Sequence, residues 1–226
     1  MQTEIKSEIK PKNGIYKRFI KRILDVIMSI IGLITLSPVF LIIALSIKLD
    51  SKGPVFFRQD RLGKDGKVFK IFKFRTMVVN AENMGTGLSI RSISDNRITK
   101  VGTFLRKTSL DELPQFVNIL KGDMSIVGPR PPATYFPYKG YANYPEWAQK
   151  RFNIRPGITG LAQVVYRNNA EWEERIGLDI KYIDNITFIT DIRLIIATVF
   201  KIIKRENIYG EVLLKKTDIN MKEESQ

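Results

Sequence analysis

The chain has 226 residues, a formal net charge of +14 at pH 7, and neither cysteine nor histidine. The missing residue types exclude disulfides, thiolate or imidazole metal sites, cysteine nucleophiles and Ser-His-Asp catalysis. Any catalysis must therefore rest on carboxylates, Lys, Tyr, Arg or an oxygen-bound metal. The positive charge favours nucleic acid, anionic lipid or phosphorylated small molecules as partners.

A long apolar segment begins near the N-terminus. Residues 26–47 carry no charge and are rich in Ile, Leu and Val, and a helix needs about 20 such residues to cross a bilayer core. Ser37-Pro38 lies near the middle, where proline removes a backbone donor and bends a helix. We therefore expect two half-helices broken at Ser37 and Pro38, with the Ser37 hydroxyl satisfying a freed backbone group.

Basic residues flank this segment on both sides. They are Lys17, Arg18, Lys21 and Arg22 before it, and Lys48, Lys52, Arg58 and Arg61 after it. Since basic flanks mark the cytoplasmic side of a membrane, both ends are predicted to be cytoplasmic. The pattern favours a re-entrant hairpin that enters and leaves by one face. The alternative is an ordinary kinked helix that spans the membrane once.

The next segment predicts a β-hairpin. Residues 54–59 and 67–75 are rich in aromatic and β-branched residues and flank a turn that contains Asp65-Gly66. Residues 80–96 show little periodicity and contain several Gly, Ser and Asn residues, which is typical of a surface loop.

Two helices are predicted beyond this loop. Ser109 is expected to N-cap the first, with Glu112 completing a capping box and Gly122 ending the helix. Asp191 is expected to open the second helix. Its apolar side is formed by Ile192, Ile195, Val199 and Ile203. This helix suits a membrane surface, and a buried core helix explains its pattern equally well.

Asp111 and Glu112 are the strongest candidates for chemistry. Side chains at adjacent helical positions diverge by about 100°, so the two carboxylates are expected to take different roles. One could attack phosphorus while the other binds a hard cation such as Mg²⁺, which prefers oxygen ligands. Taken alone, the pair is also explained as favourable charge at the positive end of a helix dipole.

Several arginines could bind phosphate groups near this pair. Arg106 precedes it and Arg130, held between two prolines, follows it, so two guanidinium groups could converge on a diphosphate. Arg151 and Arg155 add two cations beside the glycine-rich turn at 156–160. Each arginine could equally contact only solvent or lipid headgroups.

Three sequence blocks carry a resemblance to a known family. They are KTSLDELPQ at 107–115, LKGDMSIVGPRP at 120–131 and RPGITGLAQ at 155–163. Together with the broken apolar segment and FKFRTM at 72–77, they closely resemble the bacterial sugar transferase family, the monotopic phosphoglycosyl transferases of glycan assembly.

The resemblance implies an activity and a mechanism. Members of the family transfer a sugar 1-phosphate from a UDP-sugar to polyprenyl (undecaprenyl) phosphate and release UMP, the first membrane step in building bacterial glycans. By motif position, Asp111 would be the nucleophile that forms a covalent phosphosugar intermediate in a ping-pong reaction. Glu112 would bind the Mg²⁺ cofactor, and Arg106 and Arg130 would bind phosphate.

Four further positions are carried over from the family. Asp191 matches an acidic residue at or near its active site. Arg151, Arg155 and Gln163 fall in a segment that resembles its nucleotide-facing side. All four are therefore expected to bind substrate.

These inferences give a predicted organisation. We expect a mainly helical α+β fold with a basic N-terminal segment at 1–18, a re-entrant membrane helix at 19–48, a cytosolic catalytic domain at 49–206 and a tail at 207–226. The domain would carry a small β-hairpin and surface amphipathic helices, and would face the cytoplasm at the bacterial inner membrane. Expected partners are a UDP-sugar, polyprenyl phosphate and membrane lipid, without nucleic acid. The sugar, the glycan and whether the protein forms a homodimer stay open.

Two alternatives belong to other functional classes. The positive charge and the basic aromatic stretch at 72–75 would suit a membrane-tethered protein that binds single-stranded nucleic acid. That reading leaves the carboxylate pair unexplained. A non-catalytic membrane scaffold is the second alternative, and the intact Asp111 and Glu112 argue against it.

Overall fold

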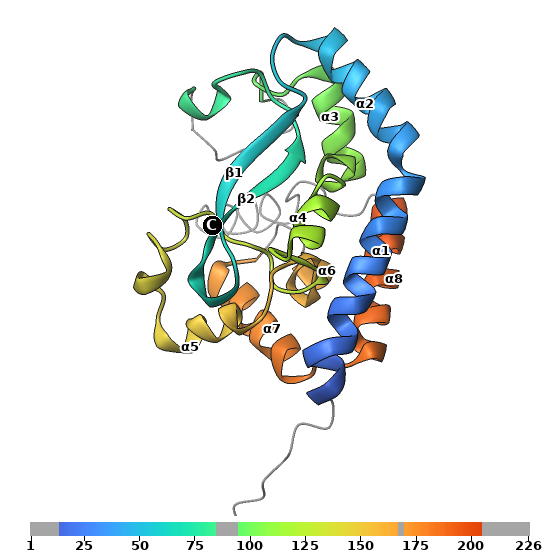
Figure 1. The fold of residues 1–226 in the computed structure, drawn as a ribbon. Coiled ribbons are helices and arrows are strands. Elements are labelled where there is room, and N and C mark those ends of the chain that lie inside the picture. The colour runs from blue at the N-terminus through green and yellow to red at the C-terminus, as the bar shows by residue number, and fades with distance from the viewer. Residues whose placement is uncertain (1–13, 85–94, 167–169, 205–226) are drawn as a thin grey trace, which may run out of the picture.

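The computed structural model describes residues 14–84, 95–166 and 170–204, and it shows a mainly helical fold with two small two-stranded sheets (Figure 1). The helices are α1 (Lys21–Thr35), α2 (Ser37–Asp50), α3 (Lys100–Thr108), α4 (Gln115–Lys121), α5 (Glu146–Gln149), α6 (Leu161–Tyr166), α7 (Trp172–Asp184) and α8 (Phe188–Lys204). The strands are β1 (Phe56–Leu62), β2 (Val68–Phe74), β3 (Ser125–Val127) and β4 (Gly157–Thr159). A π-helical turn lies at Tyr16–Ile20, and 3₁₀ turns lie at Lys64–Gly66, Ala81–Asn83, Leu110–Glu112, Tyr141–Asn143 and Lys150–Asn153. The predicted mainly helical class with a small β-hairpin is confirmed.

The apolar N-terminal segment is broken where the sequence predicts. α1 ends at Thr35, α2 begins at Ser37 with Pro38 in its first turn, and the two helices are bent by 60°. The Ser37 hydroxyl donates to the Ile34 carbonyl over 2.8 Å, and the Thr35 hydroxyl donates to the Ile31 carbonyl over the same distance. Side-chain oxygens therefore satisfy carbonyls that the break would otherwise leave free.

Only the two helices together have the length and apolar character of a membrane segment, among the described residues. Within the described ranges, no helix by itself has both the length and the apolar character needed to cross a bilayer, whereas the bent pair Tyr16–Thr35 and Ser37–Asp50 has them when taken together. Its exposed large apolar residues are Phe19, Ile20, Ile23, Ile27, Met28, Ile30, Ile31, Ile34, Leu41, Ile42, Leu45 and Leu49. This much exposed apolar surface on one segment indicates contact with lipid or protein.

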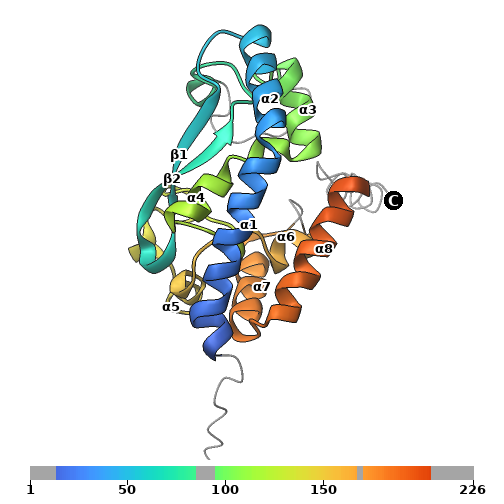
Figure 2. The ribbon, with the colours of Figure 1, turned by 45° about the vertical axis from the view of Figure 1, so that its right-hand side comes forward.

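One side of α1 is anchored to the rest of the domain by polar contacts, beside α4 and the start of α8 (Figure 2). The buried Asp25 carboxylate accepts from the Ser125 hydroxyl at 2.7 Å and from the Ile126 amide at 3.0 Å, both at strand β3. Arg22 donates to the Ile119 carbonyl at 2.6 Å, so a cation caps the C-terminal end of α4.

Changing Asp25 to alanine is expected to lower the free energy of unfolding by about 2–4 kcal/mol, because two donors at β3 lose a charged acceptor. Asp25→Asn keeps one acceptor oxygen and should lose less than half of that amount. Thermal unfolding of the purified protein in detergent compares the two variants. Equal melting temperatures for wild type and Asp25→Ala would show that this anchor contributes nothing.

The β-hairpin is confirmed in position and pairing. β1 and β2 are antiparallel with Phe56 opposite Phe74 and Leu62 opposite Val68. The connecting turn has Asp65 at φ 56° and Gly66 at φ 71°, so both residues adopt the left-handed conformation that Asp and Gly tolerate best. Phe74 and Ile71 are buried on opposite faces of β2, in two different core clusters, and Lys73 lies on the same face as Ile71 and donates to Glu112.

Strands β3 and β4 form a parallel pair that fixes the Pro129–Pro132 turn. Ser125 pairs with Gly157 and Val127 with Thr159. A Cβ atom at Gly157 would lie 2.1 Å from the Gly128 nitrogen, so only glycine allows this close backbone approach. The sequence pattern did not predict this second sheet, because each strand is only three residues long.

Helix α8 begins at Phe188, three residues before the predicted start at Asp191. Ile192, Val199 and Ile203 are exposed, whereas Leu194 is buried and Ile195, partly buried, packs against the same core cluster. The interpretation of α8 as a fully buried core helix is therefore wrong. Residues 1–13 of the basic N-terminal segment, most of the predicted 80–96 loop and the 207–226 tail lie outside the described residues.

Candidate active site

The predicted capping box at Ser109 does not form. Ser109 has φ 58° and closes the C-terminal end of α3 instead, and its side chain caps no helix. The left-handed residue reverses the chain after Thr108 and starts the 3₁₀ turn Leu110–Glu112, which carries both carboxylates. α4 starts only at Gln115 and ends at Gly122, as predicted for its C-terminus. Adjacent positions on this tight turn give the two acidic side chains different surroundings.

Glu112 is held by two cations. Its Oε1 atom accepts from Lys73 Nζ at 2.6 Å and from Arg130 Nη2 at 2.9 Å. These neighbours outweigh the effect of burial and hold the pKa of Glu112 far below its ordinary value. Glu112 is therefore ionised at any physiological pH.

Asp111 has the opposite environment. The residue is only 9% exposed, and none of the described residues forms a hydrogen bond or ion pair with its carboxylate. Burial, reinforced by the negative charge of Glu112 and opposed by Lys73, raises the pKa of Asp111 from 3.8 to about 6. The result is a carboxylate that is mostly ionised at neutral pH and has its oxygens unoccupied by protein donors, as a nucleophile requires.

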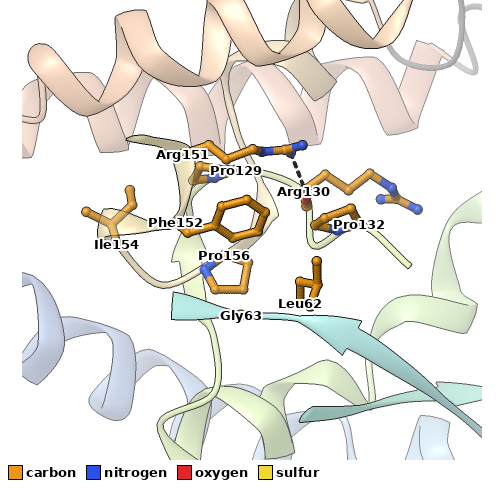
Figure 3. A pocket seen from close by; sticks show the side chains of 9 residues that line it. All are labelled: Leu62, Gly63, Pro129, Arg130, Pro132, Arg151, Phe152, Ile154 and Pro156. Atoms are coloured by element: carbon orange, nitrogen blue, oxygen red, sulfur yellow. Dashed lines mark hydrogen bonds between the residues drawn. The ribbon is translucent and has the colours of Figure 1, made fainter. Parts of the chain in front are cut away.

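Arg130 reaches the pair from a rigid turn. Figure 3 shows its backbone between Pro129 and Pro132, beside a small pocket lined also by Leu62 and Phe152. The Arg130 side chain extends away from Leu62 and Phe152 in this view. Its Nη2 atom donates to Glu112 at 2.9 Å, and 38% of the side-chain surface is exposed. Arg151 donates to the Arg130 carbonyl at 2.9 Å and so fixes the turn from behind.

Arg106 lies on the last turn of α3. Its Nε donates to the Thr76 hydroxyl at 2.8 Å, which leaves the terminal nitrogens of the guanidinium for other partners. Its positive charge lowers the pKa of Asp111, against the larger effect of burial. Together, Lys73, Arg106 and Arg130 surround the carboxylate pair with positive charge.

The structure places the remaining predicted substrate-binding residues outside this cluster. Asp191 is buried and accepts hydrogen bonds from Tyr16, Lys21 and Tyr182, over 2.6–2.7 Å, which ties α8 to the start of α1. Arg155 donates to the Gly122 carbonyl at 2.8 Å. Within the described ranges, neither residue has a hydrogen bond or ion pair with the carboxylate pair.

Arg151 and Gln163 lie in a separate pocket. It borders Arg130, and it is lined also by Trp172, Arg175 and Asp179. Asp179 pairs with Arg151 at 2.8 Å. Arg130 therefore both contacts the carboxylate pair and lines this pocket.

Sequence reasoning missed Lys73 as a site residue. Lys73 lies inside the FKFRTM block that supported the family resemblance, but a basic residue on a strand gives no sign of its partner. Arg175 and Asp179 on α7 carried no motif and were also missed. Their spacing of four on one helix was the available signal, since such residues share a face.

The acidic residues fit a magnesium ion only together with substrate oxygens. The described parts of the chain hold no group of three or more acidic side chains that could enclose a metal. Mg²⁺ is commonly bound by one or two carboxylates plus substrate phosphates, and Glu112 keeps its second oxygen free of protein donors. The residue set is therefore compatible with a metal that arrives with a phosphorylated substrate.

Comparisons with known proteins agree with these motifs. A family model described as bacterial sugar transferase matches residues 16–205. The UDP-glucose:undecaprenyl-phosphate glucose-1-phosphate transferase of Klebsiella pneumoniae is 46% identical over 196 residues, which cover 84% of this chain and 41% of that protein. The chain thus spans less than half the length of this relative.

Two other relatives are closer in length. A protein of the same name from Caulobacter vibrioides is 42% identical over 194 residues, covering 84% of this chain and 72% of that protein. The uncharacterized sugar transferase EpsL of Bacillus subtilis is 40% identical over 190 residues, covering 84% of this chain and 90% of that protein.

Proposed function

This chain belongs to the bacterial sugar transferase family, and we propose that it moves a sugar 1-phosphate from a UDP-sugar to undecaprenyl phosphate. The observation that supports the proposal most directly is the contrast within the carboxylate pair. Asp111 is buried and free of donors, whereas Glu112 is paired with Lys73 and Arg130. The names of the relatives supply the substrates, and the chain's own residues supply the chemistry.

In the first half-reaction, an Asp111 carboxylate oxygen attacks the β-phosphorus of the UDP-sugar. A new bond forms between Asp111 and phosphorus, and the bond from that phosphorus to the bridging oxygen breaks. UMP leaves with the bridging oxygen and its electron pair. Arg130, which donates to Glu112, and Arg106, whose charge lowers the pKa of Asp111, would stabilise the negative charge that develops on the phosphoryl oxygens.

In the second half-reaction, a phosphate oxygen of undecaprenyl phosphate attacks the phosphorus held on Asp111. The bond between Asp111 and phosphorus breaks, and the carboxylate is restored. The product is a sugar joined to the lipid through a diphosphate. No general base is needed, because the attacking group is an anionic oxygen, which agrees with the absence of histidine from the sequence.

We propose that Mg²⁺ assists this reaction. Glu112 would hold it together with phosphate oxygens of the bound substrate. When bound, the ion supplies charge neutralisation at the diphosphate. Lys73 would then keep its pairing with the other Glu112 oxygen and hold that side chain in place.

We also propose that α1 and α2 form a re-entrant hairpin in the inner membrane, with the domain on the cytoplasmic side. The 60° bend, the exposed apolar residues and the basic flanks at both ends support this proposal. A single-leaflet hairpin brings the catalytic pair to the depth of the lipid phosphate. The exposed apolar side of α8 would lie along the same surface.

A burst experiment tests the ping-pong reaction. Purified protein in detergent with Mg²⁺ and a mixture of UDP-sugars, but without acceptor, should release about one UMP per enzyme and then stop. Adding undecaprenyl phosphate should restart the release and give steady turnover. UMP release that appears only when the acceptor is present would exclude a covalent intermediate. No release under any condition would favour the scaffold interpretation.

The burst should have an acidic limit near pH 6. Only ionised Asp111 attacks, and its pKa is raised from 3.8 to about 6, so the burst rate should fall about tenfold per pH unit below this value. UDP-sugars have no ionisation in this range, so the first half-reaction reports on the enzyme. A burst rate that stayed constant down to pH 4.5 would show that the carboxylate keeps an ordinary pKa.

The hairpin topology can be tested because the chain has no cysteine of its own. Single cysteines at Gly14 and Lys64, both exposed and on either side of the helix pair, should react with an impermeant maleimide only in inverted vesicles. Reaction of the two sites from opposite sides of the membrane would replace the hairpin by a spanning helix.

A further inference from the structure

The pocket behind Arg130, called here the arginine pocket, is defined by six polar or aromatic side chains. They are Arg130, Arg151, Gln163, Trp172, Arg175 and Asp179. Three guanidinium groups share it with a single carboxylate, so its formal charge is positive. The pocket opens to solvent.

Several buried polar atoms in this pocket have no hydrogen-bond partner among the described residues. The Arg151 side chain is 1% exposed, and its Nη2 is shared between Asp179 and the Arg130 carbonyl. Its Nε and Nη1 atoms are buried without any hydrogen bond, as are both amide atoms of Gln163 and the Oδ1 atom of Asp179. Because buried polar groups are nearly always paired in native proteins, these atoms indicate an occupant that binds there.

The charge of the pocket identifies the kind of occupant. Arg175 donates through Nε to the Ala170 carbonyl at 2.9 Å, and among the described residues its terminal nitrogens have no hydrogen-bond partner. Burial and the nearby Arg130 lower the pKa of Arg175, whereas burial raises the pKa of Asp179 to about 6. Asp179 pairs with Arg151 and Glu112 pairs with Arg130, which leaves Arg175 without an ion pair among the described residues. An anion with several oxygens would accept hydrogen bonds from the free donors, and its negative charge would reduce the repulsion between the arginines.

Arg130 connects the pocket to the catalytic pair. One of its nitrogens donates to Glu112 at 2.9 Å, and the same residue lines the pocket. A diphosphate could therefore place one phosphate at Asp111 and the next at the arginine pocket. None of the pocket residues belongs to α1, α2 or α8, which carry the exposed apolar surface. This location favours the nucleotide over the lipid acceptor.

We propose that the arginine pocket binds the phosphate of the nucleoside monophosphate that leaves, with Arg175 and Arg151 as its donors. This proposal rests on the proposed function and assigns a substrate-binding role to Arg175. Arg175 anchors the α-phosphate while the β-phosphorus transfers to Asp111, and it holds UMP afterwards. The unpaired groups of Gln163 and Asp179 remain available to the nucleoside part.

Calorimetric titration of the full chain in detergent with UMP and with uridine tests the proposal. Arg175→Met should weaken UMP binding at least about tenfold, since a charge-assisted fork of hydrogen bonds is lost, and should leave uridine binding unchanged. Arg175→Lys should recover part of the affinity. The matched control is Arg193→Met on the exposed surface of α8, which should bind UMP as wild type does. Melting temperatures identify any variant that fails to fold, in which case the lysine variant decides.

The half-reactions separate the possible outcomes. Arg175→Met should slow the UMP burst but leave transfer from preformed phosphosugar-enzyme to undecaprenyl phosphate unchanged. If only the second transfer slowed, the pocket would belong to the acceptor and the assignment would be overturned. Unchanged UMP binding in Arg175→Met would mean that only water fills the pocket. Failure of the wild type to release UMP would instead contradict the proposed function itself, whereas UMP release without measurable UMP binding would overturn the assignment of the pocket.

Discussion

Replacing Asp111 with asparagine is expected to abolish the UMP burst while making the protein more stable. The burst should be lost completely, because an amide oxygen cannot form the phosphosugar bond. Burial makes the ionised carboxylate unfavourable in the folded state, and a pKa raised from 3.8 to about 6 corresponds to about 3 kcal/mol of penalty above pH 6. Asparagine removes the charge but buries an amide, so a net gain of about 1–2 kcal/mol is expected.

The pH dependence of this gain follows from the direction of the shift. The folded protein binds the Asp111 proton more tightly than the unfolded chain does, so stability falls as pH rises from about 4 to 6 and stays lowered above that. The advantage of Asp111→Asn should therefore be full at pH 7.5 and vanish below pH 4. Thermal unfolding at both pH values measures it, and a gain of roughly 3–6 °C is expected at pH 7.5.

Asp184→Asn is the control for this measurement. Asp184 is an exposed aspartate paired with Lys150 at 2.8 Å, and its replacement should change neither the burst nor stability by more than about 0.5 kcal/mol. An Asp111→Asn protein that unfolds at a lower temperature than wild type would show that the carboxylate is stabilised by the site. Residual UMP release in this variant would show that another residue is the nucleophile.

Local sequence signals predicted those parts of the fold that depend on neighbouring residues. Pro38 breaks the apolar segment by its own geometry, and Asp65-Gly66 forms a turn whose left-handed conformations these residue types allow. The same kind of reasoning failed at Ser109, where the residues matched a capping box but the chain reverses instead. Packing of α3 against the domain overrides the local preference at that position.

Contacts between residues far apart in the sequence could not be predicted from local sequence patterns. Lys73 reaches Glu112 from 39 positions away and Arg130 does so from 18, and neither pairing is visible in a linear pattern. Asp191 appeared as a site residue through resemblance, and its observed partners include Tyr16, 175 positions away. The family motifs identified the residue types of the site, whereas the fold determines which carboxylate is paired and which is free.

Replacing Glu112 with glutamine is expected to have the opposite effect on stability from replacing Asp111. The change leaves Lys73 and Arg130 without their shared counter-charge, and Lys73 is largely buried. Removing one partner of a buried ion pair costs about 3–5 kcal/mol, and the partial exposure of Arg130 reduces the expected loss to about 2–4 kcal/mol. UMP release should fall at least about 100-fold, because the proposed metal ligand is lost.

The double variant Lys73→Met with Glu112→Gln separates the structural role of Glu112 from its chemical one. Removing the stranded lysine should restore most of the lost stability, whereas UMP release should stay low and its dependence on Mg²⁺ should be weakened. Glu146→Gln, at an exposed position on α5, is the matched control and should behave as wild type. Recovery of activity in the double variant would mean that Glu112 acts only by neutralising Lys73. If Glu112→Gln instead stabilised the protein as Asp111→Asn is expected to do, the two carboxylates would be equivalent and the assignment of a free nucleophile beside a paired ligand would fail.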